Sequence, residues 1–295
     1  MTDIITLAAG DWLAEVAPAI GGALLSLSFK GEDLLRPTSA EAVEAGDVRL
    51  TAAYPMIPYA NRIDHGRFSF DGRAWQLERS NTASHSLHGV GWRRAWAVQA
   101  KHAQACTLSL LHRPDIDGVQ DWPFAFEARQ RFVLSAQGLT LTLAVTNLEQ
   151  APAPAGIGWH PFFRRRHGET LAFQAKAAWR NGPDLLPSGV ETDANWNHAL
   201  GQALNQRVWD NDFSGWGGLA SLDAPSGLPI RLRAGSVFGA LRLYTPAGQD
   251  FYAVEPVSHL ANAINRPKLE DHAMTLLAPG ASLHGDIEIG LETKS

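Results

Sequence analysis

The chain of 295 residues has a single cysteine, no long apolar run and no excess of basic charge. One cysteine, Cys106, excludes an intramolecular disulfide and is typical of a reducing compartment. The 30 acidic residues outnumber the 25 basic ones, so a basic surface for nucleic acid or an anionic membrane is missing. No apolar segment approaches the roughly 20 residues that cross a bilayer, and the first residues do not resemble a signal peptide. We therefore expect a cytoplasmic protein with no nucleic-acid or membrane partner.

Motifs for nucleotide, hydrolase and metal chemistry are also missing. Nothing matches the glycine-rich loops that hold phosphates or the G-x-S-x-G turn of serine hydrolases. His85 and His88 lie three residues apart, but that spacing suits metal binding on a helix, and this stretch is predicted to be a loop. The sequence therefore predicts chemistry that needs neither a cofactor nor a metal ion.

Helical periodicity is scarce, whereas apolar and polar residues alternate along much of the chain. The clearest case is residues 124–134 and 139–147, which predict two strands joined by a tight turn. A second hairpin is predicted at residues 68–77. Further strands are expected at residues 4–7, 13–18, 23–29, 105–110, 228–234, 241–245 and 283–291. Together with 27 glycines and 17 prolines, these patterns predict an all-β fold, a large antiparallel β-sandwich or barrel, with residues 1–295 in one domain.

Two short phrases each place one titratable side chain directly before a proline. Residues 156–163 (GIGWHPFF) contain His160, and residues 253–259 (AVEPVSH) contain Glu255. Because proline is rare inside a sheet, both side chains are expected where a strand ends. A histidine and a glutamate so placed suit an acid and a base held on opposite sides of a small ligand. For each phrase alone, a buried and hydrogen-bonded side chain is the alternative.

Three further stretches combine ionisable residues with glycine, proline and aromatic residues. Residues 54–63 (YPMIPYANRI) predict a rigid loop with Arg62, whose planar donors suit vicinal hydroxyls or a carboxylate; a structural ion pair is the alternative. Residues 85–96 (HSLHGVGWRRAW) set His88 before a glycine and two tryptophans, which suit the apolar face of a pyranose ring. Residues 208–216 (VWDNDFSGW) set carboxylates beside aromatic residues, as in sugar-binding sites, although such residues also cap turns.

Taken together and in this order, the phrases resemble the aldose 1-epimerase (galactose mutarotase) family. The likeness extends over residues 13–291 and rests on the matching phrases at residues 58–63, 87–89, 158–163, 210–213, 254–256 and 277–283. The resemblance implies a galactose mutarotase-like supersandwich whose concave face binds a monosaccharide, a hexose or a pentose, without a cofactor. It implies an isomerase that interconverts α and β anomers by opening the sugar ring.

The resemblance also implies roles for individual residues. Glu255 would be the general base and His160 the general acid. Substrate binding would fall to Asn61, Arg62, His88 and Asp210. Galactose-type members have Ser-Tyr-Phe after the catalytic histidine, whereas this chain has Pro-Phe-Phe, so the identity of the sugar stays open.

Three alternatives remain at the level of the sequence. A glucose-6-phosphate 1-epimerase would need basic side chains at the site, and Arg93, Arg94 and residues 164–166 are the candidates. A non-catalytic carbohydrate-binding protein on the same scaffold would need neither His160 nor Glu255. A sugar lyase or hydrolase would need a second carboxylate or a tyrosine at the site, and the sequence places none there. Residues 179–216, the least regular part of the chain, are expected to form a long loop that walls one side of the cleft.

Overall fold

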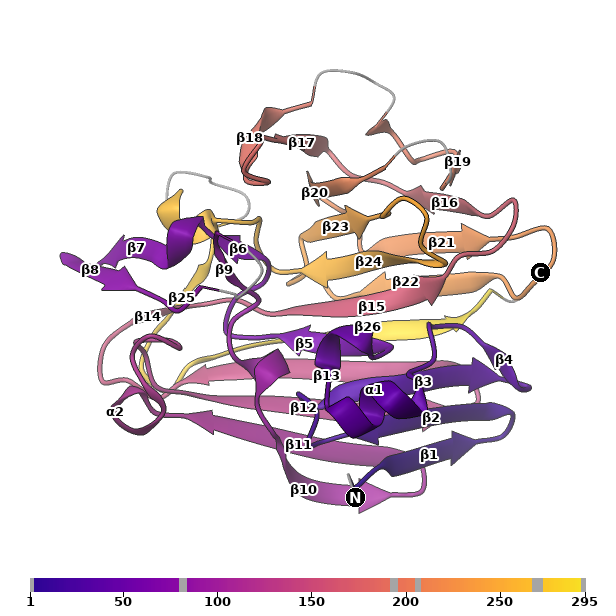
Figure 1. The fold of residues 1–295 in the computed structure, drawn as a ribbon, viewed down its shortest axis with the longest axis horizontal. Helices are drawn as coiled ribbons and strands as arrows, with labels where there is room; N and C mark the ends of the chain where they lie inside the picture. Colours follow the sequence, from indigo (N-terminus) through magenta and orange to yellow (C-terminus); the bar gives the residue numbers. More distant parts are fainter. Residues whose placement is uncertain (1–2, 80–83, 192–195, 205–207, 267–272, 293–295) are drawn as a thin grey trace.

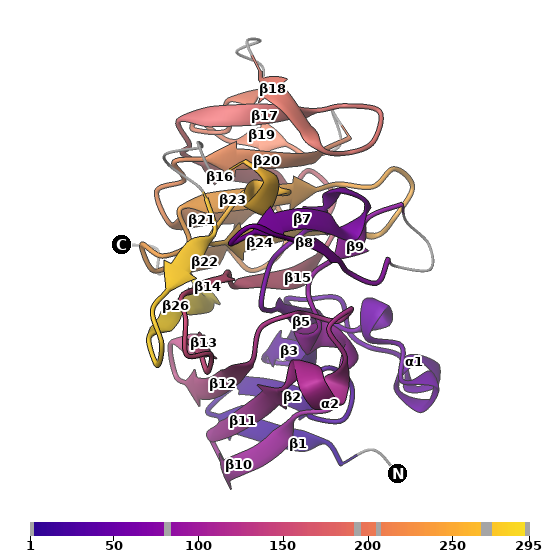
Figure 2. The same ribbon diagram turned by 90° about the vertical axis from the view of Figure 1, so that its left-hand side faces the viewer.

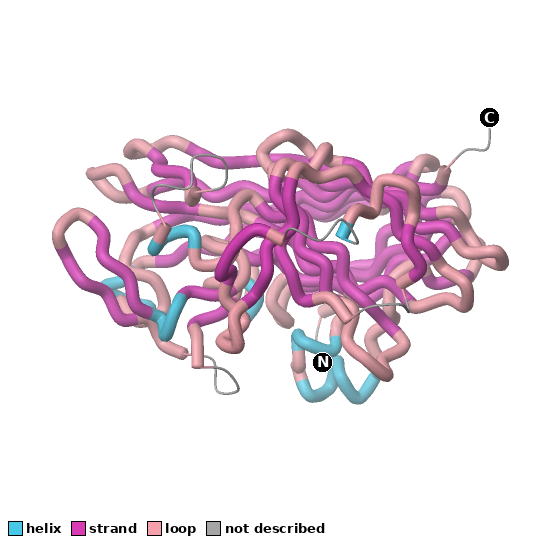
Figure 3. Tube along the Cα trace, turned by 90° about the horizontal axis from the view of Figure 1, so that it is seen from above, coloured by secondary structure: helices cyan, strands magenta, loops and turns pink. Residues whose placement is uncertain are grey.

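The protein consists almost entirely of antiparallel strands arranged in two large stacked sheets (Figure 1; Figure 3, seen from above). The computed structural model describes residues 3–79, 84–191, 196–204, 208–266 and 273–292. Within these residues, no helix is both long enough and apolar enough to span a membrane. The prediction of an all-β fold with large antiparallel sheets is confirmed.

The first sheet has 11 strands in the order β1-β2-β3-β5-β15-β24-β23-β20-β17-β18, with β4 paired to β3. Its strands are β1 (Ile5–Ala9), β2 (Trp12–Ala17), β3 (Ala23–Phe29), β4 (Glu32–Asp33), β5 (Ala53–Met56), β15 (Gly158–Arg164), β17 (Ala177–Asn181), β18 (Pro187–Val190), β20 (Asp210–Ser214), β23 (Ala240–Tyr244) and β24 (Phe251–Val257).

The second sheet has nine strands in the order β10-β11-β12-β13-β26-β22-β21-β16-β19. Its strands are β10 (Ala97–His102), β11 (Ala105–His112), β12 (Phe126–Ser135), β13 (Gly138–Asn147), β16 (Thr170–Phe173), β19 (Gln202–Ala203), β21 (Leu219–Asp223), β22 (Ile230–Ala234) and β26 (Ser282–Leu291).

Short elements decorate the two sheets. Three two-stranded ribbons pair β6 (Arg62–Ile63) with β9 (Ser86–Leu87), β7 (Arg67–Phe70) with β8 (Arg73–Gln76), and β14 (Ala153–Ala155) with β25 (Thr275–Leu277). The short helices are α1 (Ala40–Ala45), η1 (Val48–Leu50), η2 (Asp64–Gly66), η3 (Gly91–Arg93), α2 (Pro114–Asp117) and η5 (Ala263–Asn265). Figure 2 shows α1 on the outer side of the first sheet, away from β26 of the second.

The main core lies between the two sheets and follows from the alternation in the sequence. Every second residue of β12 and β13 is buried, so that Phe132 lies opposite Leu141 in one buried pair. Phe163 and Val254 of the first sheet belong to the same buried cluster. Their chain neighbours therefore point to the outer face of the first sheet, because successive side chains of a strand alternate between its faces. Cys106 is also buried in this core.

One expectation about the fold was wrong. Residues 179–216 do not form a long loop, since β17 to β20 lie largely within them. The missed strands have only two to five residues, so alternation has too few repeats to show. Residues 192–195 and 205–207 of this region lie outside the described part of the chain.

The segment that carries His88 is held against the end of β5 by a glycine. The N–H groups of Val90 and Gly91 both donate to the carbonyl oxygen of Ile57 at 2.9 Å. Gly89 has a φ of 70°, and a Cβ atom there would lie 2.3 Å from that same oxygen. Only glycine fits both the conformation and the space.

We expect Gly89→Ala to lower the free energy of unfolding by about 2–4 kcal/mol, from left-handed strain plus the clash with Ile57. Gly248 is the matched control because it has the same φ of 70° and no atom within 4 Å of the position that a Cβ would take. Gly248→Ala should cost only about 1 kcal/mol. Urea unfolding of both variants measures the difference, and equal costs would contradict the role of the close contact.

Candidate active site

A single row of residues crosses five neighbouring strands of the first sheet. In order from β5 to β20, the row is Tyr54, His160, Glu255, Arg242 and Asp212. His160 pairs with Tyr54, Arg242 pairs with Glu255, and Asp212 pairs with Arg242. Directly opposite residues of an antiparallel pair project from the same face, so the strand register alone gathers these side chains.

The same counting places His160 opposite Glu255. Gly158 pairs with Val257 in the antiparallel ladder of β15 and β24, and two steps inward along each strand lead to His160 and Glu255. The side chains are in contact, with 3.4 Å between His160 Nε2 and Glu255 Oε1. The expectation of an acid and a base on opposite sides of a ligand was therefore wrong. The two groups lie side by side in the sheet.

The expectation that both residues end a strand was also wrong. Pro161 and Pro256 lie inside β15 and β24, where they pair with Ala53 of β5 and Leu241 of β23. Among the described residues of the β15–β24 ladder, no pairs are formed between Gly158–Val257 and Phe162–Ala253. Because each proline lacks an N–H group, the ladder between β15 and β24 is interrupted here. The two strands are held in place by their pairing with β5 and β23 on their other sides.

Burial decides the charge of the central pair. It raises the pKa of Glu255 to about 8, against the lowering effect of the Arg242 guanidinium. Burial also lowers the pKa of His160 to about 3, and the positive charges of Arg36 and Arg242 add to this. Between these values the pair holds one proton, and its resting form is a carboxylic acid beside a neutral imidazole.

Arg242 anchors the acidic end of the row. Its guanidinium is buried and donates to Asp212 Oδ1 at 2.7 Å and to a carboxylate oxygen of Asp210. Asp212 also accepts the N–H of Ala261 at 2.8 Å. Burial alone would raise the pKa of Asp210, but the guanidinium groups of Arg242 and Arg62 lower it below its usual value. Asp210 is therefore ionised at neutral pH.

The other predicted site residues lie on the wall next to this row. Arg62 Nη2 lies 3.3 Å from Asp210 Oδ2, and its Nη1 donates to the side-chain oxygen of Asn61 at 3.3 Å. The N–H of Asn61 donates to His88 Nδ1 at 3.1 Å. Burial lowers the pKa of His88 well below its ordinary value, so its neutral ring carries the proton on Nε2. The rings of His88 and His160 are 5.5 Å apart at 90°.

These residues line one pocket of about 610 Å³ on the outer face of the first sheet, a volume typical of small-molecule sites. All six residues that the sequence singled out line it: Asn61, Arg62, His88, His160, Asp210 and Glu255. Residues that sequence reasoning missed also line it, among them Arg36, Arg49, Tyr54, Phe162, Leu185, Arg242, Tyr244, Gln249 and Phe251. From residues 179–216, Leu185 and Asp210 reach the pocket.

The two tryptophans after His88, which the sequence suggested for the face of a sugar ring, are not among the described residues that line the pocket. Trp92 and Trp96 are both buried, and their indole N–H groups donate to the carbonyl oxygens of Gly89 and Gly91. Trp92 packs behind Tyr54, with ring centroids 5.6 Å apart. The aromatic surface of the pocket comes instead from tyrosine and phenylalanine side chains of the strands.

The basic residues suggested for phosphate recognition are also placed elsewhere. Arg93 pairs with Glu78 and Asp121, and Arg94 pairs with Asp117. Arg164 and Arg166 pair with Asp33 and Glu32 of β4, and Arg165 donates to backbone carbonyls. None of them is among the described residues that line the pocket, so the sequence-based candidates for that role were wrong.

One cluster has the composition of a metal site, but both ring nitrogens of its buried histidine are already used in hydrogen bonds. Asp64, His65 and His85 place three potential ligand atoms within 4.8 Å of one another. The two ring nitrogens of His85 are engaged, since Nδ1 accepts the N–H of His65 at 3.0 Å and Nε2 lies 2.9 Å from the carbonyl oxygen of Asp184. We interpret the cluster as a hydrogen-bonded support for the loop between β17 and β18.

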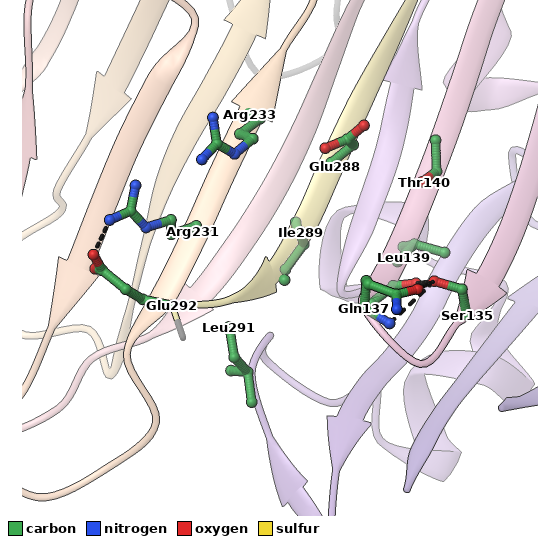
Figure 4. A pocket seen from close by; sticks show the side chains of 12 residues that line it. Ser135, Gln137, Leu139, Thr140, Arg231, Arg233, Glu288, Ile289, Leu291 and Glu292 are labelled. Carbon is green, nitrogen blue, oxygen red and sulfur yellow. Dashed lines mark hydrogen bonds and ion pairs between the residues drawn. The ribbon is translucent and has the colours of Figure 1, made fainter. Parts of the chain in front are cut away.

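A second hollow, of about 680 Å³, lies on the second sheet beside the turn that joins β12 and β13 (Figure 4). Its charged side chains belong to a strand face in which Arg233 lies opposite Glu288 and Arg231 pairs with Glu292. None of the predicted site residues lines it. The acid–base pair therefore identifies the smaller pocket as the candidate active site.

We expect Arg242→Gln to lower the free energy of unfolding by about 3–5 kcal/mol, because it leaves the buried carboxylate of Asp212 without its partner. Arg129→Gln is the control, since Arg129 is exposed and pairs with Glu127 at the surface. That change should stay within about 1 kcal/mol. Urea unfolding compares the two variants, and a similar small loss in both would show that the buried pair does not stabilise the site.

Comparisons with known proteins show the family to which the chain belongs. A family model described as aldose 1-epimerase matches residues 3–290. The chain is 28% identical over 305 residues to the uncharacterized protein YphB of Escherichia coli (strain K12), covering 98% of this chain and 99% of that protein. A solved structure of a candidate aldose 1-epimerase from Escherichia coli K12 has a TM-score of 0.88 at 26% identity, with 99% of both chains covered. A galactose mutarotase-like protein from Clostridium acetobutylicum shares the fold, with a TM-score of 0.87 at 19% identity over 99% of this chain and 96% of that one. Because the family model covers nearly the whole chain, this protein belongs to the aldose 1-epimerase family.

Proposed function

We propose that this protein is a mutarotase, an isomerase that interconverts the α and β anomers of a monosaccharide. The observation that carries the proposal is the contact of 3.4 Å between His160 and Glu255 inside a pocket with polar walls. Anomer exchange moves one proton off the C1 hydroxyl and another onto the ring oxygen. Both oxygens are bonded to C1, so an acid and a base that lie side by side suit them.

The first step of the reaction uses the single proton of the pair. A shift of this proton from Glu255 to His160 gives a carboxylate and an imidazolium. The carboxylate of Glu255 then takes the proton of the C1 hydroxyl, and His160 gives its proton to the ring oxygen as the C1–O bond of the ring breaks. The product is the open-chain aldehyde. Rotation about the C1–C2 bond and reversal of both transfers close the ring as the other anomer.

The polar wall would hold the sugar over this pair. Arg62 and Asp210 offer donors and an acceptor to neighbouring hydroxyls, and their mutual ion pair fixes both side chains. His88 would donate its Nε2 proton to the ring oxygen or an adjacent hydroxyl, because Nδ1 is engaged by the backbone of Asn61. These four residues would therefore bind and orient substrate, which aligns the reacting atoms.

We expect Glu255→Gln to lower the rate constant of anomer exchange by at least about 100-fold, because the amide cannot accept the C1 hydroxyl proton. Sugar affinity should change little. Exchange of freshly dissolved α-D-glucose, α-D-galactose and α-D-xylose is followed by polarimetry or NMR. Glu169→Gln is the control, since Glu169 is also a buried glutamate whose pKa burial raises, yet it does not line the pocket. Retention of most of the turnover by Glu255→Gln would refute its role as the base, and sugar binding without acceleration by the wild type would favour a non-catalytic binding protein.

The pH dependence follows from the one-proton state of the pair. We expect kcat/KM to fall above about pH 8, because the pair then loses the proton that His160 must donate. The plateau should extend below neutrality, since His160 gains a second proton for the pair only near its pKa of about 3. Exchange rates are measured from pH 5.5 to 9.5 after subtraction of spontaneous mutarotation. A kcat/KM that still rises from pH 8 to 9.5 would show that the pair does not act in its one-proton form.

A further inference from the structure

Arg36 lines the pocket beside Phe162, which follows His160 by two residues on β15. Its guanidinium carbon lies 4.1 Å from the ring centre of Phe162 and 4.4 Å from that of Phe251, so it packs into the corner formed by two phenyl rings that are perpendicular to each other. Its Nη2 donates to the carbonyl oxygens of Arg49 and Thr51 at 2.8 and 2.7 Å. Stacking and hydrogen bonds together fix the plane and the direction of this side chain.

This fixed cation has no carboxylate in direct contact among the residues that the structure describes. Among the described residues, no carboxylate lies within the 4.0 Å of an ion pair with Arg36, and the exposed Asp250 acts on it only from a longer distance. Its Nε is buried and has no hydrogen-bond partner among the described groups. Burial lowers the pKa of Arg36, but a guanidinium stays protonated at neutral pH.

The other cations of the pocket are all paired. Arg49 forms a two-pronged contact with Asp47, with distances of 2.9 and 2.8 Å. Arg62 pairs with Asp210, and Arg242 pairs with both Asp210 and Asp212. A partly buried arginine that is held in place but unpaired pays a desolvation cost that a bound anion offsets.

We propose that Arg36 is a subsite for an anionic group on the sugar, so that the substrate is a monosaccharide with a carboxylate or phosphate substituent. The expected position of that group rests on the proposed function. His160 protonates the ring oxygen, and the exocyclic C6 is attached to the ring carbon bonded to that oxygen. The ring of His160 lies 4.3 Å from that of Phe162, on which Arg36 stacks. With the ring oxygen held at His160, we place the C6 substituent on this side of the pocket, near the guanidinium.

The test compares neutral and anionic sugars of the same configuration. Dissociation constants of the wild type are measured by calorimetry at low salt for glucose, glucuronate and glucose 6-phosphate, and for galactose and galacturonate. At least one anionic sugar is expected to bind at least about tenfold more tightly than its neutral counterpart, and added salt should reduce this preference. Equal binding of all neutral and anionic pairs would overturn the proposal.

Substitutions locate the preference. Arg36→Met should remove at least about tenfold of the affinity for the anionic sugar and leave the neutral sugar within about twofold. Arg36→Lys keeps the charge without the planar fork and should retain part of the preference. Arg164→Met is the control because Arg164 is exposed and pairs with Asp33 outside the pocket. An equal loss in Arg164→Met, or an unchanged preference in a folded Arg36→Met, would refute the subsite, with circular dichroism confirming the fold.

Failure of this inference and failure of the proposed function give different results. Anion-selective binding without any acceleration of anomer exchange would refute the mutarotase and leave the subsite. Exchange of neutral sugars with no preference for anionic ones would refute the subsite and leave the mutarotase.

Discussion

The candidate site depends on the register of one row of residues across five antiparallel strands. Tyr54, His160, Glu255, Arg242 and Asp212 meet because each lies opposite the next. A slip of β24 by one residue would turn Glu255 into the core and Val254 into the pocket, since successive side chains alternate between faces. The register is held by the apolar side chains on the other face, such as Val254, Phe163 and Leu243, which pack against the second sheet. The stability of the sandwich and the alignment of the acid–base pair therefore have the same cause.

Burial has different effects on the ionisable groups at the end of this row and on those in its middle. At one end, Arg242 is buried with Asp210 and Asp212 around it, and the contacts with Arg242 and Arg62 lower the pKa of Asp210 below its usual value. In the middle, His160 and Glu255 contact each other, and desolvation drives both to their neutral forms although Arg242 favours the carboxylate of Glu255. Moving the single proton from Glu255 to His160 leaves the net charge of the pair unchanged. In the proposed mechanism, a sugar hydroxyl in contact with the carboxylate would favour the ionised arrangement, so ligand binding itself would prepare the pair for proton transfer.

The sequence predicted those features that repeat or that use unusual residues. The hairpin of β12 and β13 was predicted because strands of ten residues show alternation many times. His160 and Glu255 were marked by the prolines that follow them, although their position inside strands was not foreseen because the neighbouring strands supply the pairing. Nothing in the sequence around Arg242 distinguishes it, because an arginine between two leucines is typical of a strand with one face in solvent. Its burial depends on the ion pair with Asp212, which lies 30 residues away along the chain. Arg36 gave no signal either, since the phenylalanines that cover it come from β15 and β24. The catalytic roles and the single-domain organisation stay predictions.

The proposed subsite at Arg36 and the proposed chemistry at His160 are connected through the charge of Arg36. The positive charge of Arg36 is one of the causes that lower the pKa of His160, next after burial. An anion bound to Arg36 would offset that charge and raise the pKa of His160 toward its ordinary value, which favours the imidazolium that protonates the ring oxygen. A neutral sugar leaves the charge of Arg36 in place and gains no such effect. The same contact would therefore select an anionic sugar in binding and make the acid more available in the chemical step, so the preference should be larger in kcat/KM than in the dissociation constant.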